Sequence, residues 1–339
     1  MSITIDHSNF TPFSSLLGGA LIGLSSSLFL VASGRIAGIS GLLKVAVSPS
    51  ANESDVGLKR AFIAGLVLSG TCASLFGFTH IPSMDLTKLL IGGILVGAGA
   101  NLQHGCTSGH GVCGLSRMSP KSLVLVCTFM MSGVLTETWA KVHILSLFSH
   151  LSTPTGVGET VSILAKSLFP ILSVGGVLSS FMRHKRNPTV PTFGVFSGSL
   201  FGTGLVISGM SNPSKVVSFL DITGTWDPSL MFVMGGAILV SLYPFHYVQN
   251  KGKGKSGKGT GTYIFPRETF STMKYLQPSS WTQHPAKFRS LLGAVLFGAG
   301  WSVSGMCPGP GLVLGGAGSS DAIIYIPAVI FGQWISDRV

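Results

Sequence analysis

The most informative run of the sequence extends from Gly97 to Arg117 and reads GAGANLQHGCTSGHGVCGLSR. Its skeleton returns later in the chain, where Gly298-Ala299-Gly300 leads to Cys307 with the spacing by which Gly97-Ala98-Gly99 leads to Cys106. A third copy lies between them, and there Ser211 takes the position of Cys307. A repeated apolar, glycine-rich segment that ends in a cysteine is typical of a transporter built from repeats.

The composition indicates a membrane protein. Only 10% of the 339 residues are charged, 46% are hydrophobic, and the mean hydropathy is +0.55. Soluble domains carry about 25% charged residues. The 46 glycines suit helices that pack closely in lipid. The net charge of +11 comes without basic runs interleaved with aromatics, so we expect no nucleic-acid partner.

Apolar runs of spanning length recur along the whole chain. They predict an all-α integral membrane protein with about nine transmembrane helices, and they comprise Phe13–Ser33, Ala61–Thr79, Leu86–Gln103, Leu123–Trp139, Val161–Met182, Phe193–Met210, Leu230–Val248, Leu291–Met306 and Ala322–Ile335.

Short segments between these runs predict four re-entrant helices, because they are too short to cross a bilayer. They are Ile36–Val47, His110–Leu115, Ser214–Leu220 and Gly309–Gly316. This pattern divides the chain into a first repeat half (13–150), a connecting span (160–182) and a second half (192–335) that contains a basic linker (250–287). The single connecting span inverts the second half, which predicts an inverted-repeat hourglass with its site at the midplane.

The basic residues predict the orientation. With the N-terminus outside, the inner loops hold all of the 22 basic residues except Lys88, Lys141, Lys166 and Lys215. The positive-inside rule therefore favours a multi-pass protein of a plasma or inner membrane with a cytoplasmic C-terminus. The N-terminal apolar run has no basic flank and fits a cleaved signal peptide poorly.

Cys106 and Cys307 are the main candidate transport residues. Each ends a span and opens a bend rich in glycine, with Pro308 following Cys307 directly. No basic residue is adjacent, so each thiol is expected to be neutral, and a neutral thiol is a weak, polarizable donor that suits a soft sulfur solute. We expect Cys72 and Cys127 to be small buried hydrophobes.

Further candidates surround these two cysteines. Cys113 follows Cys106 by about two helical turns and has either a functional or a packing role. His110 is expected to begin a short helix whose N–H groups face an anion, with backbone approach eased by neighbouring glycines. The remaining candidate pore residues are Ser108, Gly109, Gly111, Ser211 and Asn212; Thr107, Asn101 and Gln103 could line a pore or bond helix to helix.

A metal site is a weaker reading. His104, Cys106, His110 and Cys113 have a spacing that could ligate a soft metal. The second half has no matching histidine or second thiol near Cys307. We therefore expect neither a metal nor another cofactor, and a soft-metal permease stays an alternative.

These motifs resemble the YeeE/YedE family of membrane transporters for sulfur-containing ions, thiosulfate in particular. The resemblance covers nearly all of 13–335, as if two half-length members were fused, and it is carried by the runs Gly105–Arg117, Ser208–Val216, Phe219–Asp221, Trp226–Leu230 and Gly305–Pro310. It implies short helices that meet at a central constriction, where Cys106 and Cys307, with Cys113 as a third candidate, pass the solute through weak S–H contacts.

The chain departs from the family at two bends. Full-length members carry a further cysteine in the first unit of a half, whereas here the corresponding bends read Ala32-Ser33-Gly34-Arg35 and Met210-Ser211-Asn212. A shorter series of thiols leaves thiosulfate, sulfide, polysulfide and persulfide species open as substrates.

We therefore expect a non-enzymatic transporter for a small sulfur-containing anion, with the lipid bilayer and a cytoplasmic sulfur-carrier protein as candidate partners. The chain has no nucleotide-binding loop to couple transport to ATP. The alternative from another class is a membrane sulfurtransferase, in which Cys106 accepts sulfur as a persulfide and His104 or His110 supplies the base.

Overall fold

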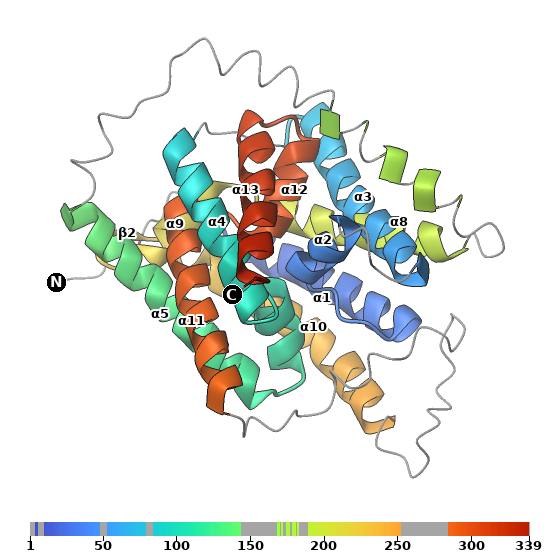
Figure 1. Cartoon of the computed structure of the whole chain (residues 1–339), viewed down its shortest axis with the longest axis horizontal. Helices are drawn as coiled ribbons and strands as arrows, with labels where there is room; N and C mark the ends of the chain where they lie inside the picture. Colours follow the sequence, from blue (N-terminus) through green and yellow to red (C-terminus); the bar gives the residue numbers. More distant parts are fainter. Residues whose placement is uncertain are drawn as a thin grey trace.

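The computed structural model describes residues 4–5, 10–47, 53–78, 84–143, 189–251 and 284–338, with parts of 168–182 (Figure 1). Most of the predicted connecting span (160–182) and of the basic linker (250–287) lies outside the described residues.

The described chain is almost entirely helical. The long helices are α1 (Pro12–Ser33), α3 (Glu53–Leu75), α4 (Leu86–Leu102), α5 (Pro120–His143), α8 (Thr189–Ile207), α10 (Ser229–Lys251), α11 (His284–Ser304) and α13 (Ser320–Ser336). The short ones are α2 (Ile39–Val47), η1 (Thr107–Gly114), α9 (Pro213–Leu220) and α12 (Pro308–Gly316). Two short strands, β1 (Thr4–Ile5) and β2 (Thr225–Trp226), pair in parallel.

These helices confirm an all-α multi-pass membrane protein. Among the described residues six helices are long and apolar enough to span a bilayer, or seven if α4 and η1 form one span bent by 46°. Outward-facing apolar side chains such as Phe13, Leu135 and Leu239 are 81%, 62% and 74% exposed, as lipid contact requires. Cys72 and Cys127 are also exposed, so the prediction that they are buried was wrong. On the spanning helices α3 and α5, an outward thiol meets lipid, which tolerates a small apolar group.

The packing follows the repeat seen in the sequence. If the two halves are matched, α1 corresponds to α8, α3 to α10, α4 to α11 and α5 to α13. Contacts between helices occur in matching pairs under this correspondence. The contact of α3 with α8 matches that of α10 with α1, and the contact of α4 with α13 matches that of α11 with α5. In Figure 1, α5, α11, α4 and α13 lie side by side. Such packing is expected of two related halves, and the inversion between them stays a prediction.

Glycines allow these helices to touch along their backbones. A Cβ on Gly92 of α4 would lie 3.0 Å from the carbonyl oxygen of Gly300 in α11, and one on Gly99 would lie 2.6 Å from that of Gly293. Gly92 corresponds to Gly293, and Gly99 corresponds to Gly300. If the two halves are interchanged, each of these two contacts therefore becomes the other. Because lipid supplies no hydrophobic drive between helices, such close packing holds the bundle together.

Glycine-to-alanine changes should therefore destabilise the fold at matched positions. A Cβ at Gly97 would lie 2.0 Å from the Val329 carbonyl oxygen, and one at Gly298 would lie 2.1 Å from that of Phe129. We expect Gly97→Ala and Gly298→Ala each to cost about 1–3 kcal/mol, as overpacking does, measured as a lower melting temperature in detergent. Gly235→Ala is the control, since no atom lies within 4 Å of its Cβ. Equal melting temperatures for all three variants would contradict this packing.

Candidate functional site

The bend after each of four long helices contains a residue with left-handed backbone. These residues are Gly34 after α1, His104 after α4, Gly209 after α8 and Gly305 after α11, with φ of 69°, 61°, 73° and 61°. The chain then runs extended into α2, η1, α9 and α12, so the four predicted short segments are confirmed as helices. The left-handed region costs a side chain energy, which explains glycine at three of the four bends.

The two candidate cysteines occupy matching places after these bends. Cys106 precedes η1 with φ −127° and ψ −167°, and Cys307 precedes α12 with φ −100° and ψ 164°. The carbonyl of Cys106 accepts from the N–H of His110 at 2.9 Å, and that of Cys307 accepts from Gly311 at 3.0 Å. Each cysteine thus begins a short helix, and both thiols are buried, at 2% and 3% exposure.

A cavity of about 50 Å³ lies at these helix starts and is lined by residues from both predicted halves. That volume holds a few water molecules or one small ion. Its polar lining consists of Cys106, Thr107, Ser108 and Cys307. The rest of its wall is Ile22, Ile39, Val112, Phe201, Leu205, Met210, Phe219, Leu230, Val233, Met234, Trp301, Gly309 and Pro310.

Hydroxyl and thiol groups in the wall are paired. The Thr107 hydroxyl lies 3.3 Å from the Cys307 sulfur, which joins the first half to the second, and the Cys106 sulfur lies 3.2 Å from the Ser108 hydroxyl. Ser108 also accepts from the Ile39 N–H at 3.3 Å. No charged side chain is among the described residues of the wall. The site can therefore offer an anion only neutral donors and polarizable sulfur.

His110 has a supporting position rather than one in the wall. The short helix begins at Thr107, three residues before its predicted start, because the extended Cys106 already starts the turn. The imidazole Nδ1 lies 3.1 Å from the Ser122 hydroxyl, and Nε2 lies 3.0 Å from the Gln103 carbonyl oxygen. His110 therefore holds η1 against the end of α4 and the start of α5.

Cys113, Gly109 and Gly111 shape the surroundings of η1. Cys113 is fully buried in an apolar cluster with Leu30, Phe245 and Val248 and does not line the cavity. Gly109 and Gly111 are not in the wall either. A Cβ on Gly111 would lie 3.2 Å from the Met234 methyl group, and one on Gly109 would lie 3.9 Å from Gly38.

The candidates of the later bends also lie beside the cavity wall. The Asn212 side chain accepts from the Ser214 N–H at 3.1 Å and thereby caps α9. Ser211 is 9% exposed, and Pro308 opens α12, where a proline needs no N–H partner. The structure brings Met210, Gly309 and Pro310 to the wall instead of these three.

Asn101 bonds helix to helix. Its amide donates to Ser336 and to Asp337, both at 2.8 Å, and its oxygen accepts from Lys44. Burial raises the pKa of the Asp337 carboxyl, but the hydrogen bonds from Lys44 and Asn101 outweigh this and lower the pKa. Gln103 is fully buried, and its side-chain amide has no partner among the described residues.

The aromatic side chains of the wall were not predicted. Phe201, Phe219 and Trp301 come from α8, α9 and α11. Of the three, only Phe219 falls in a run that carries the family resemblance, and that run does not indicate a place in the cavity wall. Only the pairing of distant helices brings them to the two cysteines. Among the described residues, no group of three or more histidines, cysteines and acids could hold a metal ion.

A multi-pass helical bundle with a small neutral cavity has the general architecture of a membrane transport protein. Residues 192–265 and 280–338 match the family described as "Family of unknown function (DUF6691)". A "Probable transporter" of Xylella fastidiosa (strain 9a5c) is 38% identical over 132 residues, which cover 38% of this chain and 94% of the relative.

A second "Probable transporter", of Xylella fastidiosa (strain Temecula1 / ATCC 700964), is 32% identical over 149 residues, covering 44% of this chain and 88% of the relative. The chain belongs to the family of these transporters. Since each relative is covered almost fully by less than half of this chain, both are much shorter than it.

Substitution of the left-handed residues at two matched bends, His104 and Gly305, should have opposite effects on stability. His104 is exposed, and its backbone is left-handed, which is unfavourable for a residue with a side chain. His104→Gly removes this conformational cost, so it should raise the free energy of unfolding by up to about 1 kcal/mol and raise the melting temperature with it. Gly305→Ala should lower the melting temperature, because the backbone there is left-handed and the added Cβ would lie 2.9 Å from the Pro213 carbonyl oxygen. Equal losses in both variants would show that the bends are not held as described.

Proposed function

We propose that this protein transports thiosulfate or a related sulfur-containing anion through the cavity between Cys106 and Cys307. The observation that carries the proposal is the meeting of two matched cysteines, one from each half, at one small cavity. The family of probable transporters supports transport in general, and the resemblance to YeeE/YedE proteins supports a sulfur anion.

The chemistry of the wall favours a soft anion over a hard one. Removing a small oxyanion from water is costly, and no charged side chain of the described wall offsets that cost. A terminal sulfur atom is large, polarizable and weakly hydrated, so it loses less on entering the apolar part of the cavity. Thiols and hydroxyls at Cys106, Thr107, Ser108 and Cys307 then supply weak hydrogen bonds.

Weak, neutral contacts also suit passage rather than tight binding. Conduction requires that an ion enter favourably and still leave. The matched thiols offer similar sulfur contacts from both halves, so the anion can pass from one to the other without a covalent step. His110 is hydrogen-bonded to Ser122 and Gln103, which disfavours it as the base that the sulfurtransferase alternative needs. His104, the other candidate base, does not line the cavity.

The proposal predicts which cysteines transport requires. In proteoliposomes, Cys106→Ala and Cys307→Ala should each lower the uptake of radiolabelled thiosulfate at least about tenfold, the loss expected for one or two hydrogen bonds. Cys72→Ala and Cys127→Ala should retain uptake because these thiols are exposed on the helix surfaces. Sulfate is the control anion and should compete poorly.

Two outcomes would contradict this proposal. Uptake that survives both cavity substitutions, with the folded protein retained, would remove the cysteines from the mechanism. A persulfide on Cys106 after exposure to thiosulfate, found by mass spectrometry, would favour sulfur transfer over passage.

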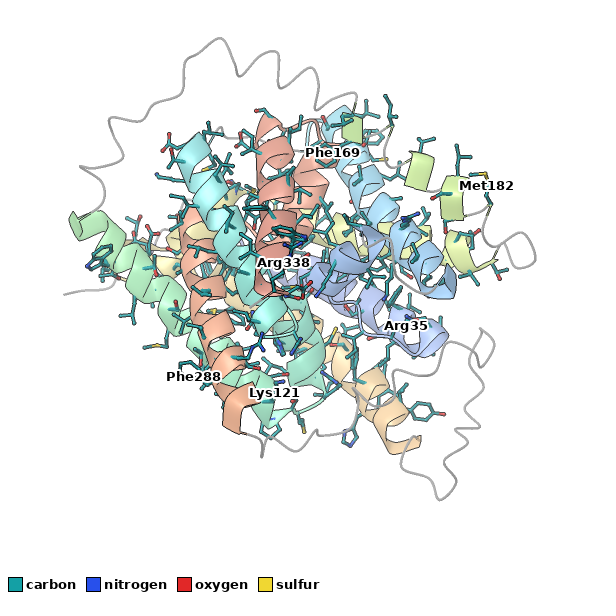
Figure 2. The ribbon with its side chains drawn as sticks, viewed as in Figure 1. Arg35, Lys121, Phe169, Met182, Phe288 and Arg338 are labelled. Atoms are coloured by element: carbon teal, nitrogen blue, oxygen red, sulfur yellow. The ribbon has the colours of Figure 1, made fainter. Side chains whose placement is uncertain are left out.

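We further propose that the N-terminus is outside and the C-terminus is cytoplasmic. The support for this orientation is the charge distribution of the sequence, in which 18 of the 22 basic residues fall on the predicted inner side; Arg35, Lys121 and Arg338 are three of them (Figure 2). A green fluorescent protein fused after Val339 should fluoresce, and alkaline phosphatase fused there should be inactive. The reverse pair of results would contradict the orientation.

A further inference from the structure

Trp301 of α11 lines the cavity and carries a buried indole N–H that has no partner among the described residues. The residue is 2% exposed. Buried tryptophan N–H groups almost always find an acceptor, and an unpaired one costs about 1–3 kcal/mol.

Neighbouring rings hold the indole in place. Its ring lies 6.1 Å from that of Phe129, edge to face at 82°, and 6.5 Å from that of Phe219. The next residue, Ser302, donates to Glu137 at 3.0 Å and so ties this turn of α11 to α5. A donor fixed in this way keeps its direction without an ordering cost when a ligand arrives.

The donor is absent from the matched positions of the other three units. Counting back from the left-handed residue of each bend, the position of Trp301 is held by Leu30, Ala100 and Leu205. Each predicted half contributes one cysteine to the cavity wall, whereas only the second half contributes a tryptophan, Trp301. The described wall of the cavity therefore contains two cysteines, one from each predicted half, and a single tryptophan.

We propose that Trp301 is a specificity-determining residue that donates its indole N–H to an oxygen atom of the transported anion. This inference rests on the proposed function and narrows its substrate to an anion with a sulfur end and an oxygen end. An indole N–H can only donate, and a hydrogen bond to a charged oxygen is stronger than one to a neutral acceptor. The sulfur end then faces the thiols.

Substitution by phenylalanine tests the donor while keeping a ring. Trp301→Phe should raise the half-saturating thiosulfate concentration in proteoliposomes about tenfold to hundredfold, the worth of one hydrogen bond to a charged group. Trp301→His should partly restore it, because imidazole again offers an N–H although it fills less space. Trp334→Phe is the matched control on an exposed ring outside the cavity.

A binding measurement complements uptake. In protein labelled with ¹⁵N-tryptophan, the indole N–H resonance that disappears in Trp301→Phe should shift downfield when thiosulfate is added. The corresponding resonance of Trp334 should not move.

Each result decides the inference. An unchanged half-saturation in Trp301→Phe, or a histidine variant no better than the phenylalanine one, would overturn the donor role while leaving thiosulfate transport standing. An indole resonance that ignores thiosulfate would overturn it as well. No thiosulfate uptake by the native chain would overturn the proposed function, and this inference with it.

Discussion

The structure depends on how the backbone leaves four of its long helices. Backbone that turns inside a membrane protein must be buried in protein and keep its hydrogen bonds. Here α1, α4, α8 and α11 are each followed by a left-handed residue, an extended segment and a short helix that restores the hydrogen bonds. The extended segment is where side chains can leave helical packing, and Cys106 and Cys307 occupy it in two of the four bends.

Close helix contacts make that geometry available at one place. Glycines let α4 and α11 touch along their backbones, and the packing of the first half mirrors that of the second. The ends of the bends therefore converge from different parts of the chain, and Thr107 of one half reaches the Cys307 sulfur of the other. A small neutral cavity follows from this convergence, because each half contributes helix starts and apolar wall rather than charges.

The sequence predicts the parts of this arrangement that repeat. The Gly-x-Gly spacing ahead of Cys106 and Cys307 indicates both the helix contacts and the paired bends, and all four short helices are found close to their predicted positions. Local pattern fails where distance along the chain matters. Trp301 and Phe219 reach the cavity through packing between units, and His110 looks like a pore residue until its partners, Ser122 and Gln103, are known.

If the anion contacts Cys106 and Cys307 together, it should protect both thiols from chemical modification. The native protein is treated with a small membrane-permeant alkylating reagent, with and without thiosulfate, and the modification of each cysteine is followed by mass spectrometry. We expect thiosulfate to slow the modification of Cys106 and Cys307 in parallel, at one half-protecting concentration, and to leave the modification of Cys72 and Cys127 unchanged. Protection of neither thiol, or of one without the other, would contradict a shared site.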